Sequence, residues 1–143
     1  MRRLILWNLM TLDGYFEGSR KAEGAIADEM NRRQKVVFSR TLREVDWMNT
    51  RLVRDAPEGE VARLKREPGK DILLFGSADL AATLMRHGLI DEYRIGLVPV
   101  VLGAGEPLFK PFPEHVKMRL VESKPLATGC VILSYRPIAT PAA

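Results

Sequence analysis

The residues best suited to hold a charged ligand follow the apolar run Asp71–Phe75, which is typical of a strand and stops at Gly76. Apolar residues then recur at helical spacing, so a helix is expected to begin at Ser77. The first turn of a helix offers backbone N–H groups to an anion such as a phosphate, and a glycine permits the close approach of the ligand. The sequence therefore predicts an anion-binding turn at Gly76, Ser77 and Ala78. A plain strand-to-helix turn without a ligand is the alternative.

Asp13 is the candidate for proton chemistry. It lies in Leu-Asp-Gly-Tyr at positions 12–15, directly after an apolar run that predicts a first strand. A carboxylate beside apolar side chains can have a raised pKa, which would let Asp13 hold or donate a proton. Asp-Gly is also a common turn dipeptide, so a purely structural turn is an equal alternative.

Histidine and cysteine do not form a recognisable cluster. Neither His87 nor His115 has another histidine or a cysteine at the spacing of metal ligands. The single cysteine, Cys130, precedes the apolar run Val131–Leu133, which favours a packed side chain over a nucleophile. No metal site is predicted.

Length and composition are those of one globular domain, residues 1–143. The net charge of +4 is modest and the basic residues are scattered, which disfavours nucleic-acid binding. No apolar stretch approaches the roughly 20 residues of a membrane-spanning helix. One cysteine fits a reducing compartment. We therefore expect a cytoplasmic protein that binds neither nucleic acid nor membranes.

Hydrophobic patterns predict the elements that position the candidate residues. Strands are expected at Arg3–Met10, Lys35–Phe38, Thr50–Val53, Asp71–Phe75, Asp91–Val101, Val116–Ser123 and Cys130–Arg136, and helices at Ala22–Arg33, at Glu58–Arg66 and from Ser77 to the residue before Gly88. Residues 71–101 form a βαβ unit, and ligands in open α/β sheets bind at the carboxyl ends of strands. The last two strands have no helix between them, which predicts an antiparallel hairpin on an otherwise parallel sheet.

Several of these segments together resemble one known family. They are Leu-Asp-Gly-Tyr at 12–15, Phe-Ser-Arg-Thr-Leu at 38–42, Leu-Phe-Gly-Ser-Ala-Asp-Leu at 74–80, and the segment 89–109 with Pro-Val-Val-Leu-Gly-Ala-Gly. Their combination is similar to the dihydrofolate-reductase-like superfamily, most of all to the reductase (RibD C-terminal-type) domain of riboflavin biosynthesis and its stand-alone relatives. The resemblance implies an α/β, dihydrofolate-reductase-like three-layer fold with a mainly parallel central sheet and an antiparallel C-terminal strand.

The resemblance also implies hydride transfer from NADPH to a small heterocycle, such as a pterin or a ribosylaminopyrimidine-like molecule. The cofactor would be held by Gly76, Ser77, Ala78, Asp79 and Leu80 at its pyrophosphate and by Ser39, Arg40 and Thr41 at its adenosine 2′-phosphate. Asp13 would be the catalytic residue beside the nicotinamide. The negative charge of Asp79 is unfavourable near a phosphate, so the alternative role of Asp79 is to cap the helix. Ser39 is alternatively a turn or cap residue, with Arg40 in solvent.

One segment that the resemblance leads us to expect is missing. Members of this family have a helix and a strand between the first loop and Phe-Ser-Arg-Thr-Leu, whereas here only a few residues follow Gly18 before the next helical pattern. The absent strand would lie inside the sheet. Neighbouring strands could close the gap, a partner chain could fill it, or the chain could be a shortened form of a longer protein. The alternative to a reductase is therefore a catalytically degenerate binding or scaffold protein, and a homodimer fits either function.

Overall fold

The computed structural model describes residues 1–16 and 25–138. Its elements are, in chain order, β1 (Leu4–Thr11), α1 (Ala25–Arg32), β2 (Lys35–Phe38), β3 (Thr50–Val53), α2 (Pro57–Arg66), β4 (Ile72–Leu74), α3 (Ala78–Arg86), β5 (Glu92–Val98), β6 (Met118–Pro125) and β7 (Val131–Pro137). The type and order of the elements agree with those expected from the sequence. Positions 22–24 of the helix expected at Ala22–Arg33, and the segment directly after Gly18, lie outside the described residues. The strand expected at Asp71–Phe75 is shorter at both ends, and the strand expected to reach Val101 ends at Val98.

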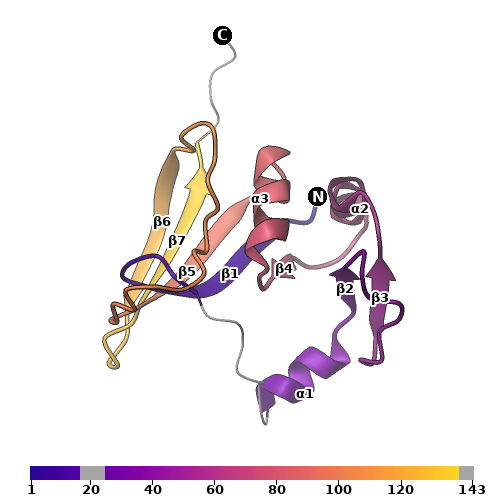
Figure 1. Cartoon of the computed structure of the whole chain (residues 1–143), viewed down its shortest axis with the longest axis horizontal. Coiled ribbons are helices and arrows are strands. Elements are labelled where there is room, and N and C mark those ends of the chain that lie inside the picture. Colours follow the sequence, from indigo (N-terminus) through magenta and orange to yellow (C-terminus); the bar gives the residue numbers. More distant parts are fainter. Residues whose placement is uncertain (17–24, 139–143) are drawn as a thin grey trace.

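The main sheet has five strands in the order β4-β1-β5-β7-β6. Strand β1 runs parallel to both β4 and β5, whereas β7 is antiparallel to β5 and to β6 (Figure 1). The expected parallel sheet with an antiparallel C-terminal hairpin is confirmed. The candidate turn at Gly76 follows β4, at one edge of this sheet.

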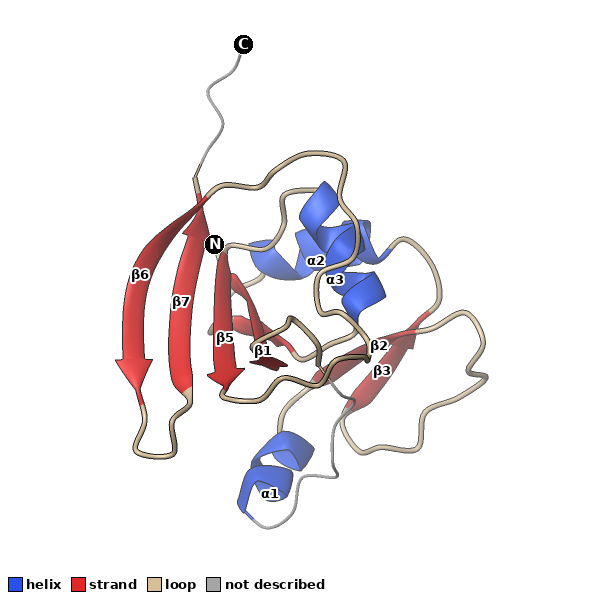
Figure 2. Cartoon of the chain, turned by 60° about the vertical axis from the view of Figure 1, so that its left-hand side comes forward, coloured by secondary structure: helices blue, strands red, loops and turns tan. Residues whose placement is uncertain are grey.

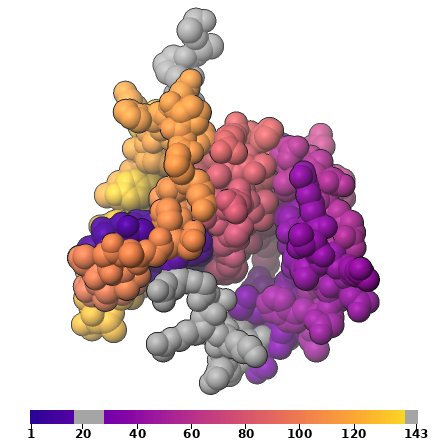
Figure 3. Space-filling view, viewed as in Figure 1, coloured from indigo at the N-terminus to yellow at the C-terminus, as the bar shows by residue number. Residues whose placement is uncertain are grey.

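Strands β2 and β3 form a separate, two-stranded parallel sheet. It lies beyond β4 in Figure 1, and the molecular surface is hollowed between this pair and α3 in Figure 3. Lys35 ties the pair to α1, since its ammonium group donates to the carbonyls of Met30 and Arg33 at 2.8 and 2.9 Å and lies 4.5 Å from the Trp47 ring centre. A parallel pair of half-buried strands is unusual, because parallel strands normally belong to larger, covered sheets.

Helices α2 and α3 pack on one face of the main sheet (Figure 2). Helix α2 begins with Pro57, whose fixed φ suits the first helical position, and it buries Val61. Helix α3 buries Ala81 and Leu84. These side chains form one core with Leu4, Leu6, Leu74 and Tyr93 of the sheet.

The opposite face of the sheet is not covered by any helix within the described residues. Leu9 of β1, Leu73 of β4 and Phe75, which follows β4, are 61%, 40% and 55% exposed. Of the layers expected in a three-layer fold, the described chain forms the sheet and the layer of α2 and α3. Within residues 1–16 and 25–138 no helix has the length and apolar character needed to cross a membrane.

Two buried charged residues join the strands and helices. Glu92 is 3% exposed and accepts from Arg3, Arg94 and Arg136 at 3.1, 2.7 and 3.2 Å. Lys65 of α2 is 6% exposed and donates to the Leu89 carbonyl at 2.8 Å. Burial alone would raise the pKa of Glu92, but the hydrogen bonds from Arg94 and Arg136 outweigh burial and lower this pKa.

Candidate functional site

The turn after β4 has the geometry of an anion site. Gly76 has a φ of +58°, a conformation that suits glycine, and the peptide bond from Gly76 to Ser77 is cis. Ser77 is the N-cap of α3, and its hydroxyl accepts from the N–H of Leu80 at 3.2 Å. No described residue accepts from the N–H groups of Ala78 and Asp79, so both remain available to an anion.

Asn8 anchors this turn to β1. With its side-chain amide in the orientation that satisfies both polar atoms, Asn8 accepts from the N–H of Gly76 at 3.2 Å and donates to the Trp7 carbonyl at 3.3 Å. Asn8 is not among the residues predicted from the sequence. The signal that could have found it is a single amide within the apolar run Leu4–Met10.

Asp79 and Leu80 contribute less to the turn than the resemblance implied. The N–H of Leu80 is used by the Ser77 cap, and its side chain packs against the core. The Asp79 side chain is 89% exposed and lies 3.9 Å from the Lys110 ammonium group, so it does not cap α3. The groups of this turn that could contact an anion are therefore the N–H groups of Ala78 and Asp79.

The second candidate turn, Ser39–Thr41, follows β2. The Ser39 hydroxyl accepts from the N–H groups of Thr41 and Leu42 at 3.3 and 3.2 Å, which makes Ser39 a turn residue. The Arg40 side chain is 80% exposed, and its Nε lies 3.5 Å from the carboxylate of Asp55. A phosphate at Arg40 would compete with Asp55 for the guanidinium group.

The structure does not unite the two turns in one sheet. Both lie at carboxyl ends of strands, as the sequence analysis expects, but β4 belongs to the five-stranded sheet and β2 to the two-stranded sheet. Within the described chain, no backbone hydrogen bond links the 39–41 turn to the 76–80 turn.

Asp13 is held by hydrogen bonds. Its carboxylate accepts from the Thr11 hydroxyl at 2.7 Å, from the N–H of Gly103 at 2.8 Å and from the N–H of Leu102 at 3.2 Å. The Thr11 hydroxyl and then the Gly103 N–H lower the pKa of Asp13. The expectation of a raised pKa is therefore wrong, because the carboxylate is exposed and hydrogen-bonded rather than enclosed by apolar side chains.

Asp13 belongs to a set of contacts that join the loop after β1 to the loop after β5. The N–H of Leu12 donates to the Val100 carbonyl at 2.9 Å, and the N–H of Phe16 donates to the Glu106 carbonyl at 2.9 Å. Tyr15 and Pro107 form an isolated antiparallel bridge. A β-carbon added to Gly76 would lie 3.8 Å from the Phe16 ring. The joined loops therefore lie beside the turn at Gly76.

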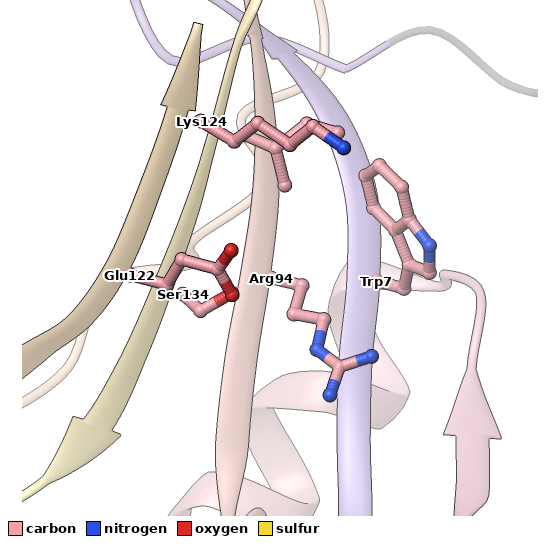
Figure 4. Close-up of a pocket in the computed structure, with 6 residues that line it drawn as sticks. Trp7, Arg94, Glu122, Lys124 and Ser134 are labelled. Carbon is pink, nitrogen blue, oxygen red and sulfur yellow. The ribbon is translucent and has the colours of Figure 1, made fainter.

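Two cavities lie on the main sheet, one on each face. On the helix side, a cavity of about 710 Å³ has a mostly apolar lining that includes Met10, Met85 and Phe109. On the uncovered face, a cavity of about 310 Å³ is lined by Trp7, Arg94, Glu122, Lys124, Ile132 and Ser134 (Figure 4). None of the residues predicted for the site lines either cavity. The described residues bring together no group of three or more His, Cys, Asp or Glu side chains that could hold a metal ion.

The chain belongs to the RibD C-terminal domain family, whose model matches residues 27–132. A relative is the uncharacterized protein YyaP of Bacillus subtilis (strain 168), which is 40% identical over 103 residues. That match covers 72% of this chain and 54% of YyaP, so the chain spans about half the length of this relative.

Solved structures share the fold at low sequence identity. A protein assigned to riboflavin biosynthesis from Shewanella sp. PV-4 superposes with a TM-score of 0.72 at 17% identity, over 96% of this chain and 99% of that one. Dihydrofolate reductase from Enterococcus faecalis, complexed with NADP(H), superposes with a TM-score of 0.64 at 12% identity, over 94% of this chain and 96% of that one. The dihydrofolate-reductase-like α/β fold expected from the sequence is therefore confirmed.

Proposed function

We propose that this chain is an NADPH-dependent reductase that transfers hydride to a small heterocycle of the pterin or ribosylaminopyrimidine type. The observation that carries the proposal is the turn from Gly76 to α3, where two N–H groups remain available at the carboxyl end of a strand. Membership of the RibD C-terminal domain family and the likeness to an NADP(H)-binding dihydrofolate reductase support it.

The residues present fit the pyrophosphate of a dinucleotide better than its adenosine 2′-phosphate. Ala78 and Asp79 would hold the pyrophosphate through their N–H groups, aided by the positive end of the α3 dipole. Such a contact contributes about 0.3–1 kcal/mol at an exposed site, so it cannot hold the dinucleotide alone. Arg40 would supply the preference for a 2′-phosphate, since a guanidinium group donates to phosphate oxygens in pairs.

NADPH supplies the hydride when it is bound, and the chain's part is to bind and orient the two reactants. Asp13 would position the loop after β1 by holding the N–H groups of Leu102 and Gly103. Because its pKa is lowered, Asp13 is a carboxylate near neutral pH, and we do not assign it the role of proton donor.

The test is NADPH consumption by the purified chain with a panel of oxidised pterins and ribosylaminopyrimidines. We expect substrate-dependent oxidation of NADPH that is strongly reduced in Ser77→Asp, which keeps a helix cap but places a negative charge at the anion-binding turn. If the folded chain binds NADPH but oxidises it with none of these compounds, the proposed reductase activity is contradicted.

The second candidate function is a binding or scaffold protein that keeps the fold without turnover. The observation that favours it is the separation of Arg40 from the Gly76 turn into two sheets, together with the pairing of Arg40 with Asp55. A folded chain with no affinity for either NADPH or NADH would support this alternative.

A further inference from the structure

The larger cavity lies on the helix side of the main sheet and takes no part in the proposed reductase site. Its floor consists of side chains that share one face of three neighbouring strands, namely Met10, Tyr93, Ile95, Leu97, Leu133 and Tyr135. Met85 of α3 and the segment from Phe109 to Val116 complete the lining. This segment belongs to the connection that leads from the end of β5 to the start of β6 (Figure 2). The volume of about 710 Å³ is within the range of roughly 300–1,000 Å³ that is typical of small-molecule sites.

Tyr93 contributes a hydroxyl group without a partner to this lining. Tyr93 is 4% exposed, and no described residue forms a hydrogen bond with its hydroxyl group. Within residues 1–16 and 25–138, no side-chain nitrogen or oxygen is both fully buried and unpaired. The Tyr93 hydroxyl group therefore opens onto free space, and the cavity is the free space that Tyr93 lines. Burial and then the Asp91 carboxylate raise the pKa of Tyr93 to about 12, so the group is a hydrogen-bond donor at neutral pH.

We propose that this cavity binds a small, uncharged aromatic molecule that carries a carbonyl group or a similar acceptor, which accepts a hydrogen bond from the Tyr93 hydroxyl group. A donor that lies in an apolar cavity without an acceptor costs free energy, and such a ligand would remove this cost. None of the residues assigned to nucleotide binding lines the cavity. The proposal is therefore independent of the proposed reductase activity.

The side chains of the lining favour an aromatic ligand. The rings of Tyr93 and Phe109 lie with their centres 6.3 Å apart and are tilted by 43°, and Phe112 and Tyr135 add two further rings. Aromatic rings attract one another in tilted and offset arrangements. Three of the six methionines of the chain also line the cavity, and these are Met10, Met85 and Met118. Methionine side chains adapt to irregular shapes, and their sulfur atoms make favourable contacts with aromatic rings.

The charges of the lining favour an uncharged ligand. Lys110 and Glu114 contribute one charge of each sign. The Lys110 ammonium group already lies 3.4 Å from the Glu106 carboxylate and 3.9 Å from the Asp79 carboxylate. A ligand of either charge would lose its hydration in a mostly apolar cavity and would also face a like charge in the lining.

The opening of the cavity exposes apolar side chains to water. Phe109 and Val116 line the cavity, yet they are 39% and 38% exposed. Removal of apolar surface from water is favourable, and a ligand in the cavity would cover both side chains. This favours an occupied cavity over an empty one.

The test uses prodan, an uncharged naphthalene that carries a dimethylamino group and a propionyl group, with the chain labelled at its methionine methyl groups for NMR. We expect saturable shifts of the Met10, Met85 and Met118 resonances. Met30 and Met48 do not line the cavity, and their resonances should not shift. A titration without saturable shifts at the three lining methionines would overturn the proposal, and so would equal shifts at Met48.

The hydroxyl group is tested by Tyr93→Phe, which removes only that group. We expect prodan to bind about fivefold more weakly to this variant. The same naphthalene without the propionyl group should bind equally to the variant and to the unchanged chain. Tyr15→Phe is the matched control, since Tyr15 does not line the cavity, and it should leave the affinity for prodan unchanged.

Thermal unfolding checks that each variant is folded. A folded Tyr93→Phe chain that binds prodan as tightly as the unchanged chain would overturn the proposal. In the unchanged chain itself, prodan should bind about fivefold more tightly than the compound without the propionyl group. Equal affinities for the two compounds would overturn the proposal without any variant.

Discussion

The carboxylate of Asp13 accepts a hydrogen bond from the N–H of Gly103 at 2.8 Å, although 90 residues separate them in the chain. This bond joins the loop after β1 to the loop after β5, at the carboxyl ends of two neighbouring parallel strands. The sequence offered proton chemistry and a structural turn as equal interpretations of Asp13. The three hydrogen bonds and the lowered pKa favour the structural one.

Replacing Asp13 should therefore loosen this loop rather than unfold the protein. In Asp13→Ala the N–H groups of Leu102 and Gly103 lose their acceptor, and we expect their hydrogen exchange to accelerate by about tenfold. Asp13→Asn retains one acceptor oxygen and should have a smaller effect. Unchanged exchange at Gly103 in Asp13→Ala would show that the contact does not hold the loop.

The hydrogen bond between the Asp13 carboxylate and the Gly103 N–H should depend on pH. A carboxyl group whose pKa is lower in the folded than in the unfolded chain stabilises the fold at pH values above its unfolded pKa of about 3.9. That stabilisation is lost as the pH falls through the pKa of the folded state. We expect the Gly103 amide resonance to be constant between about pH 7 and 5 and to shift only below about pH 4, and not to shift in Asp13→Asn. A midpoint above the unfolded pKa would contradict the hydrogen-bonded carboxylate.

Ser77 can be tested as a cap and as a cofactor contact separately. Ser77→Ala removes the side-chain acceptor for the N–H of Leu80 and should lower the free energy of unfolding by about 1 kcal/mol. Ser77→Asp keeps a capping oxygen and should unfold like the unchanged protein, yet its charge should weaken nucleotide binding. Equal nucleotide affinity in Ser77→Asp would argue against a phosphate at this turn.

Glu92 is expected to be the most sensitive charged residue of the sheet. Glu92→Gln keeps the volume but removes the charge that three arginines share, and we expect a loss of about 2 kcal/mol in urea unfolding, because the arginines are partly exposed. Glu44→Gln, at an exposed position, is the control and should change stability little. Equal stability of both variants would contradict the importance of this cluster.

The order of strands and helices could be predicted from local signals, which are the helical spacing of apolar residues, short apolar or β-branched runs, and glycine or proline at their ends. The turn between β4 and α3 could also be located, since Gly76 and Ser77 are local signals of a strand end and a helix start. The contacts of Asp13 with Leu102 and Gly103 could not be predicted, because these residues lie 89 and 90 positions away and the contacts depend on how two strands pair.

The division of the strands between two sheets likewise depends on tertiary contacts. Phe38 and Leu74 look equally like residues of buried strands in the sequence. Nothing local distinguishes a strand of a five-stranded sheet from a strand of an isolated pair. For the same reason, nothing local in the sequence separates Arg40 from Gly76, whereas in the structure they follow strands of different sheets.

The most direct test of the proposed reductase is a fluorescence titration of the purified chain with NADPH and, in parallel, with NADH. We expect NADPH to bind in the micromolar range and more tightly than NADH, and we expect Arg40→Ala to remove that preference while Arg86→Ala, at an exposed position in the last turn of α3, leaves it intact. Absence of binding by either nucleotide would contradict the account.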